Sequence, residues 1–250
     1  MGRIAVGLFG FGRTGSVVAQ EIIKDTEFEL RWVIRKSLTN EGAYASRLLG
    51  FPHEEGRIFS IEHLNFEKFY KDNMVDIIID FSDSCSVNEY MQAAEYGIRI
   101  VSAISNYNEK EFNQLLKISR DTAVLYSPNI TLGVNILIEA SKLLKKVIPN
   151  ADIDIVEEHF SNKKSISGTA LKIAEDLDLD QNEHIKSIRV GGIVGTHEVI
   201  FGLPSQTIRI KHESLSRAAF GQGALYAAKW IMGKERCIYS MEEAISELMA

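Results

Sequence analysis

The feature that most constrains the fold lies at the start of the chain, where a short apolar run, residues 4–9 (IAVGLF), leads into the loop GFGRTG at residues 10–15. Apolar side chains at residues 14–23 then recur at helical spacing, so the loop joins an expected buried strand to an expected helix. A G-x-G-x-x-G loop in this setting is typical of dinucleotide-binding sites, whereas glycines on their own also serve plain turns. The opening segment therefore predicts a Rossmann-like βαβ unit.

Each glycine of the loop has an expected task. Gly10 permits the tight turn, Gly12 lets the backbone approach a pyrophosphate, and Gly15 lets the helix pack closely against the strand. The start of the helix adds free N–H groups and the positive end of the helix dipole. The candidate cofactor-binding residues of the loop are Gly10, Phe11, Gly12, Arg13, Thr14 and Gly15.

The alternation of apolar runs with helical patterns continues through the first half of the chain. Further strands are expected at 28–34, 75–81, 98–102 and 123–126, and helices at about 86–96 and 108–119. Strands that alternate with helices indicate parallel βαβ units, and continuously apolar strands fit a sheet covered on both faces. The expected fold class of this part is therefore α/β, with a doubly wound parallel sheet.

The pattern changes after about residue 130. A long helix at 134–148 precedes a strand at 152–159, a helix that opens near Ser167, and three strand-like runs, IKSIRVGG, HEVIFG and QTIRIKH. Short turns separate these three runs, so we expect them to pair mainly antiparallel. They predict a second α+β domain with an open mixed sheet.

The expected domains are a dinucleotide-binding domain over 1–129 and a substrate-binding and oligomerisation domain over 130–216. A last helical stretch at 215–232 carries small residues that permit close packing. The segment from about 217 to 250 is therefore expected to return to the first domain.

The end of the second expected strand bears on which dinucleotide binds. NAD sites usually place an acidic residue about 20 residues after the glycine loop, to bind the ribose 2′-hydroxyl. This chain has VIRKS there, with Arg35 and Lys36 and no acid. Two cations suit the 2′-phosphate of NADPH, and Arg13 adds to their charge. We therefore favour NADPH as the cofactor, with NADH as the alternative. Alternatively, Arg35 and Lys36 are only the solvated end of a strand and bind no cofactor.

Composition excludes several other classes of protein. The net charge of −6 leaves no basic excess for a non-specific nucleic-acid binder. Cys85 and Cys237 form no CxxC pair and have no metal-ligand spacing, so no metal site is expected. No apolar stretch approaches the roughly 18–20 residues that cross a membrane, and the N-terminus lacks the apolar run of a signal peptide. We therefore expect a cytoplasmic protein with no nucleic-acid or membrane partner.

The segment EEHFSNKKSISGTA at 157–170 concentrates polar residues at the start of the second expected domain. His159 ends a strand rich in acids, and Glu157 and Glu158 are expected to raise its pKa, as proton donation would require. A structural histidine is the alternative.

The same segment opens a helix. Ser167 or Thr169 can cap it, and Gly168 allows close approach of another backbone. A helix start can also hold a carboxylate, to which Lys163 would add a positive charge. A plain N-cap is the alternative.

Nearly the whole chain resembles, in order, the 4-hydroxy-tetrahydrodipicolinate reductase (dihydrodipicolinate reductase) family. GFGRTG is similar to its N-terminal cofactor loop, IDFSDS to its strand-end IDFS/T motif, and VSAISNY lies where members carry a G/A-T-T-G loop. YSPNITLGVN resembles the segment A-N-F/M-S-x-G-V, and EEHFSNKKSISGTA resembles E-A-H-H-x-x-K-x-D-A-P-S-G-T. IRVGGIVGTHEVIF and SRAAFGQGALYAAKWI resemble the C-terminal segments.

The resemblance implies a Rossmann-like domain plus an open mixed sheet, commonly assembled as a homotetramer through that sheet. It implies reduction of a cyclic unsaturated dicarboxylate, with hydride passing from the nicotinamide to the ring and a proton to the adjacent carbon. By resemblance, His159 and Lys163 are catalytic, and the substrate-binding residues are Ser167, Gly168, Thr169 and Ser105. Further cofactor-binding residues implied in this way are Phe81, Ser82, Ala103, Ser105, Asn129 and Phe220.

Three departures from the family pattern lie on the substrate side. Phe160 replaces the second histidine, the stretch before Ser167 is one residue shorter and lacks Asp-Ala-Pro, and AISN at 103–106 replaces G/A-T-T-G. They motivate an alternative, a paralogous NADPH-dependent reductase of another cyclic imine or enamine acid. A cofactor-binding protein without catalysis is a further alternative, against which His159 and Lys163 argue.

Overall fold

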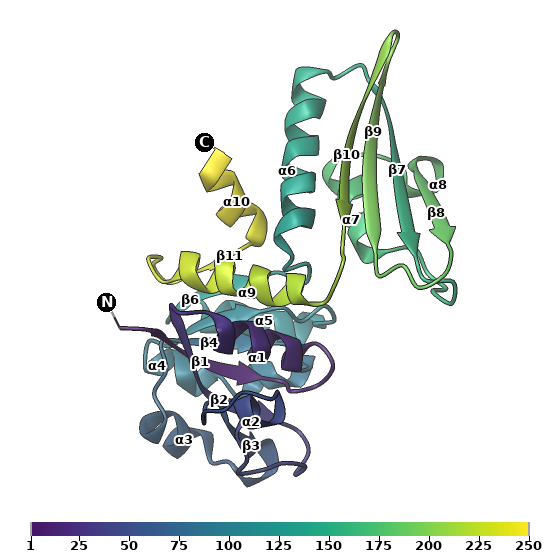
Figure 1. The fold of residues 1–250 in the computed structure, drawn as a ribbon. Helices are drawn as coiled ribbons and strands as arrows, with labels where there is room; N and C mark the ends of the chain where they lie inside the picture. The colour runs from purple at the N-terminus through teal and green to yellow at the C-terminus, as the bar shows by residue number, and fades with distance from the viewer. Residues whose placement is uncertain (1, 250) are drawn as a thin grey trace. The chain divides into compact units, whose positions relative to one another are not determined.

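The computed structural model describes residues 2–249 and divides the chain into two compact units (Figure 1). The first is formed by the chain up to Ile130 together with Phe220–Ala244. The second is formed by Thr131–Ala219 with the segment from Ile245 onward. The roles expected for them, cofactor binding and substrate binding with oligomerisation, stay predictions.

The first unit contains a seven-stranded parallel sheet in the order β11-β6-β5-β4-β1-β2-β3. Its strands are β1 (Ile4–Phe9), β2 (Phe28–Arg35), β3 (Arg57–Ser60), β4 (Ile77–Asp80), β5 (Arg99–Ser102), β6 (Ala123–Tyr126) and β11 (Cys237–Tyr239). The chain runs from β1 outward to β3 and then continues on the other side of β1 with β4, which places a topological switch point between β1 and β4. The doubly wound fold class is confirmed. The sequence reading missed β3 and β11, which are only four and three residues long.

Helices and 3₁₀ turns connect the strands of this sheet. They are α1 (Gly15–Lys24), α2 (Ala45–Leu48), η1 (Ile61–His63), α3 (Phe66–Asp72), η2 (Ser84–Asn88), α4 (Met91–Glu95), α5 (Glu109–Ile118) and α9 (Ala218–Ile231). The helical stretch expected at about 86–96 consists of two short elements, η2 and α4. Helices α3, α4 and α5 share one apolar cluster with the sheet, in which Phe9 and Trp32 meet edge to face at 5.9 Å. The small residues of α9 are used where Gly221 approaches α1, since a Cβ there would lie 2.7 Å from Glu21 Cγ.

The second unit contains a four-stranded mixed sheet in the order β10-β9-β7-β8. Its elements are α6 (Leu132–Val147), β7 (Asp152–His159), α7 (Gly168–Asp176), α8 (Gln181–His184), β8 (Ile185–Arg189), β9 (Thr196–Leu203) and β10 (Gln206–Glu213); α10 (Met241–Met249) follows β11. β9 pairs antiparallel with β10, as expected, and also with β7. The antiparallel pairing expected for β8 is wrong, because β8 lies at the far edge and pairs parallel with β7. The chain between β7 and β8 carries α7 and α8 and is long enough for a parallel crossover.

Side chains alternate strictly along β7, and this alternation places the candidate site. Ile153 and Ile155 are buried in the apolar cluster that α6 and α7 form over one face of the sheet. Glu157 and His159 follow on the same face and are also buried, whereas Glu158 is on the opposite face. Of the two acids named with His159, only Glu157 therefore shares its face of the strand. Within residues 2–249, no helix has the length and apolar character of a membrane span.

Candidate active site

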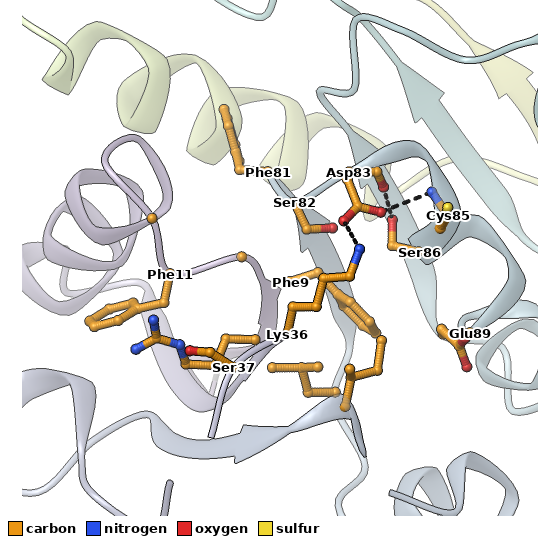
Figure 2. A pocket seen from close by; sticks show the side chains of 15 residues that line it. Phe9, Phe11, Lys36, Ser37, Phe81, Ser82, Asp83, Cys85, Ser86 and Glu89 are labelled. Carbon is orange, nitrogen blue, oxygen red and sulfur yellow. Dashed lines mark hydrogen bonds and ion pairs between the residues drawn. The ribbon is translucent and has the colours of Figure 1, made fainter. Parts of the chain in front are cut away.

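A cavity of about 400 Å³ opens in the first unit at the carboxyl ends of β1, β2 and β4 (Figure 2). Ligands of open α/β sheets bind at such strand ends beside the switch point. The sequence-predicted cofactor residues that line it are Gly10, Phe11, Gly12, Arg35, Lys36, Phe81 and Ser82. The sheet thus brings together loops that are more than 60 residues apart in the chain.

A second cavity of about 420 Å³ shares Phe81, Ser82 and Asp83 with the first. The predicted residues that line it are Thr14, Phe81, Ser82, Ala103, Ser105 and Phe220. Three other predicted cofactor residues, Arg13, Gly15 and Asn129, line neither of these two cavities in the described part of the chain. Gly15 instead has a packing role.

The glycine loop fits a bound dinucleotide. A Cβ at Gly15 would lie 2.2 Å from Gly10 O, and Gly10 itself has a φ of +94° and lies against Phe81 O. The protein's own backbone thus demands glycine at both positions. A Cβ at Gly12 would meet nothing within 4 Å, so the space in front of Gly12 is open to a ligand.

The charged residues of the cavity include an acid that the sequence reading did not anticipate. Lys36 Nζ lies 3.2 Å from Asp83 Oδ2 (Figure 2), and Arg35 Nη1 donates to Thr39 O at 3.1 Å. The Lys36 side chain is 79% exposed, so its ion pair is worth only about 0–1 kcal/mol. Lys36 can therefore exchange Asp83 for a phosphate at little cost.

Asp80 lies fully buried beneath the cavity at the end of β4. Burial raises the pKa of its carboxyl group to about 6, although hydrogen bonds from Ser82 and Ser86 oppose the change. Ser82 donates from N at 2.8 Å and from Oγ at 2.6 Å, and Ser86 Oγ contacts the other carboxyl oxygen. Ser86 Oγ is also 2.7 Å from Asp83 O. The single hydroxyl proton of Ser86 is therefore shared between the ionised Asp80 and Asp83 O, whereas a protonated Asp80 can donate to Ser86 Oγ and leave that proton for Asp83 O.

In the second unit, Glu157 is the centre of a buried polar cluster. Arg189 holds it through two bonds, Nη2 to Oε1 at 2.5 Å and Nη1 to Oε2 at 2.9 Å, and Ser187 Oγ donates to Oε1 at 2.6 Å. Burial alone would raise the pKa of Glu157, but the bonds from Arg189, Ser187 and His159 outweigh it and lower the pKa to about 2. Glu157 is therefore a carboxylate throughout the neutral range.

His159 is 8% exposed and receives its orientation from Glu157. Its Nδ1 lies 2.5 Å from Glu157 Oε2, so Nδ1 carries a proton and donates to the carboxylate. The proton that can be exchanged then sits on Nε2, on the side of Gly195, where a Cβ would come within 3.0 Å of Nε2. This geometry is that of a carboxylate-held histidine ready for acid–base chemistry.

Arg189 also connects His159 to the loop that carries Lys163. Its Nε donates to Lys163 O at 3.0 Å and its Nη2 to Ser165 O at 2.9 Å. Lys163 is half-buried, whereas Phe160 is 44% exposed and lies outside the buried cluster. Arg189 therefore bonds both the backbone of Lys163 and Glu157, the partner of His159.

Ser167 begins α7 at the N-cap position, but its hydroxyl does not cap the helix. The expectation of a Ser167 side-chain cap is wrong, because Oγ lies 2.8 Å from His197 Nε2. Gly168 and Thr169 follow as the first residues of the helix, and Gly168 is exposed. Burial, followed by the charges of His159 and His212, lowers the pKa of His197 to about 4.

Four residues of these sites, Arg189, Ser187, His197 and Asp80, were not singled out from the sequence. Strand register explains three of them: Glu157 is opposite Ser187 on β8 and opposite His197 on β9, and His159 is opposite Arg189. The motif IRVGG contains Arg189, but only the parallel pairing of β8 with β7 gives that arginine a partner.

Comparisons with known proteins agree with these features. A family described as "Dihydrodipicolinate reductase, N-terminus" matches residues 4–130, and "Dihydrodipicolinate reductase, C-terminus" matches residues 133–245. The chain is 35% identical to the 4-hydroxy-tetrahydrodipicolinate reductase of Caldanaerobacter subterraneus subsp. tengcongensis, over 69% of this chain and 77% of the relative. It is 28% identical to the protein of that name from Buchnera aphidicola subsp. Schizaphis graminum, over 98% of this chain and 97% of the relative.

Solved structures share the fold. Dipicolinate-bound dihydrodipicolinate reductase from Paenisporosarcina sp. TG-14 matches with a TM-score of 0.79 at 20% identity, over 95% of this chain and 97% of that one. An engineered D-amino acid dehydrogenase bound to NADP+ matches with a TM-score of 0.61 at 12% identity, over 99% and 96%. Since the two family descriptions together match residues 4–130 and 133–245, the protein belongs to the dihydrodipicolinate reductase family.

Proposed function

We propose that the protein is an NADPH-dependent oxidoreductase that reduces 4-hydroxy-tetrahydrodipicolinate, a cyclic dicarboxylate, to tetrahydrodipicolinate in diaminopimelate and lysine biosynthesis. The observation that carries the proposal is the buried Glu157–His159 pair, which shares its unit with Ser167 at the start of α7. The curated relatives named above carry the name of this reaction. Neither of these relatives is named for reduction of a different imine acid.

His159 is the proton donor in this proposal. Loss of the 4-hydroxyl group as water, together with a proton from the adjacent ring carbon, leaves a carbon–carbon double bond in the substrate ring. A bound nicotinamide cofactor would supply hydride to one carbon of that double bond. Glu157 keeps a proton on Nδ1 of His159, so the protonated imidazole can give its Nε2 proton to the ring carbon next to the one that receives hydride. The carboxylate then stabilises the orientation of the neutral ring until solvent restores the proton.

The start of α7 holds one substrate carboxylate. The N–H groups of Gly168 and Thr169 are the first of the helix, and the helix dipole favours a negative charge there. Lys163 contributes a positive charge from the preceding loop, and Ser167 contributes its hydroxyl. Ser105, which lines the second cavity of the first unit, is a further substrate-binding candidate.

Arg35 and Lys36 bind the 2′-phosphate of NADPH. Both line the first cavity after β2, and the weak pairing of Lys36 with Asp83 leaves it available. Asp83 lies beside this site and would repel the same phosphate, so the preference depends on the positive charges of Arg35 and Lys36 outweighing the negative charge of the acid.

The functional form is a cytoplasmic homotetramer joined through the sheet of the second unit. The edge strand β10 supports this arrangement, because its residues are exposed or half-exposed along its whole length. Exposed strand edges usually need a partner or protection. Light scattering on the purified protein tests the assembly state, and a monomer would contradict it.

A steady-state assay tests the proposed reaction. Purified protein is mixed with NADPH and freshly generated 4-hydroxy-tetrahydrodipicolinate, and NADPH oxidation is followed. We expect turnover in the ordinary enzyme range of roughly 1–10³ s⁻¹. Turnover below about 10⁻³ of that range, with intact NADPH binding, would leave only a cofactor-binding role or another substrate.

A further inference from the structure

The buried contact between Ser167 and His197 has no part in the reaction described so far. Ser167 is 3% exposed and His197 is 4% exposed, and their side chains meet at 2.8 Å between Oγ and Nε2. The Ser167 hydroxyl therefore forms no N-cap hydrogen bond with α7 and is instead hydrogen-bonded to His197 on β9.

His197 is one of three histidines on the helix-covered face of the sheet. It lies directly opposite His212 on β10 and opposite Glu157 on β7, and its ring meets that of His159 edge to face at 5.3 Å. Burial and the neighbouring histidines lower its pKa to about 4, so at neutral pH it carries a single N–H.

The position of that N–H decides which partner donates. His197 Nδ1 is buried and has no hydrogen-bond partner in the described part of the chain. If the proton were on Nδ1, a buried donor would be left without an acceptor, which is rare in folded proteins. With the proton on Nε2, His197 donates to Ser167 Oγ, and only an acceptor lone pair at Nδ1 is unpaired.

This tautomer frees the single hydroxyl proton of Ser167. Since Ser167 Oγ already accepts from His197, its own proton can be donated to a group at the start of α7. The backbone N–H of Ser167 donates to Glu157 Oε1 at 3.4 Å, so both the backbone and the side chain of the serine have buried hydrogen-bond partners.

We infer that His197 is a positioning residue that turns the hydroxyl proton of Ser167 toward the substrate carboxylate. The inference rests on the proposed function, because it assigns a donor to the carboxylate site at the start of α7. It predicts that His197 affects dicarboxylate affinity through Ser167 and leaves cofactor affinity unchanged.

The test measures binding of dipicolinate, the dicarboxylate seen in the Paenisporosarcina structure, by calorimetry with NADPH present. Ser167→Ala and His197→Met should each weaken binding about tenfold, as expected for one lost hydrogen bond to a charged group. The double variant should be no weaker than Ser167→Ala. His197→Gln, whose amide nitrogen can replace Nε2, should restore most of the affinity, whereas His197→Asn, which mimics Nδ1, should not.

His212→Gln is the matched control, because it removes a histidine from the same face without touching Ser167; its dipicolinate affinity should equal that of the wild type. Effects of Ser167→Ala and His197→Met that multiply in the double variant would overturn the inference, as would equal losses in His197→Gln and His197→Asn. If His197→Met does not fold, the Gln and Asn pair decides the question. A wild-type protein that neither binds dipicolinate nor turns over the proposed substrate overturns the proposed function itself, whereas failure of the His197 variants alone leaves that function standing.

Discussion

Replacing Arg189 with Met should destabilise the second unit and make its stability less dependent on pH. The variant removes both bonds from the guanidinium to Glu157, a carboxylate that is 0% exposed. Breaking one partner of a buried pair costs about 3–5 kcal/mol. The pKa of Glu157, about 2 against an ordinary value near 4.3, corresponds to about 3 kcal/mol from all of its partners together. We therefore expect a loss of about 3 kcal/mol at pH 7.

The sign of the pH dependence follows from the lowered pKa. A carboxylate with a lowered pKa contributes stability that is fully present above its unfolded value and is lost as pH falls toward the folded value. For the wild type, this contribution should therefore disappear between about pH 5 and pH 2. In Arg189→Met the fall over that window should be much smaller, because the stabilising partner is already missing.

Hydrogen exchange at the amides of β7 and β8 measures this effect in the second unit. Both tryptophans of the chain, Trp32 and Trp230, lie in the first unit, so unfolding followed by tryptophan fluorescence serves as the internal control. Arg189→Lys, which keeps the charge but not the two-pronged grip, should lie between wild type and Arg189→Met. Unchanged protection of β7 in Arg189→Met at pH 7 would refute the reasoning.

Three further predictions concern the first unit. Arg35→Asp should weaken NADPH binding at least about tenfold more than NADH binding, and equal losses in a fluorescence titration would defeat the 2′-phosphate assignment. The pKa of Asp80 is raised to about 6 in the folded protein, so the carboxyl group ionises first in the unfolded chain as pH rises. The free energy of unfolding of the wild type should therefore fall by about 3 kcal/mol between about pH 4 and pH 6. Asp80→Asn should lack this fall in urea unfolding followed by the fluorescence of Trp32. Gly10→Ala should lower the melting temperature, since its Cβ would lie 2.6 Å from a backbone oxygen, whereas Gly12→Ala should leave melting unchanged and weaken NADPH binding; the reverse order would contradict the roles of the two glycines.

Local patterns were enough to predict the parallel sheet and the loops at its carboxyl ends. Continuous apolar strands and the glycine loop are contiguous in sequence, and parallel pairing then brings the loops after β1, β2 and β4 together. The same locality explains why His159, Lys163 and Ser167 could be named together from one short segment.

The rest of the second site depends on pairing between distant strands. Arg189 and His197 lie near Glu157 because of the registers of β8 and β9 with β7. Arg189 was missed because β8 was expected to pair antiparallel, whereas it pairs parallel with β7. The hydroxyl of Ser167 also departs from its local preference for capping a helix, because the buried ring of His197 lies within hydrogen-bond distance of it. No propensity encodes that choice.

The rate of NADPH oxidation by His159→Ala with 4-hydroxy-tetrahydrodipicolinate tests the central claim most directly. If His159 donates the proton, kcat should fall about 10²–10⁴-fold while NADPH binding is retained. Lys163→Ala should instead act mainly through KM for the dicarboxylate. A His159→Ala variant with the kcat of the wild type would contradict the account.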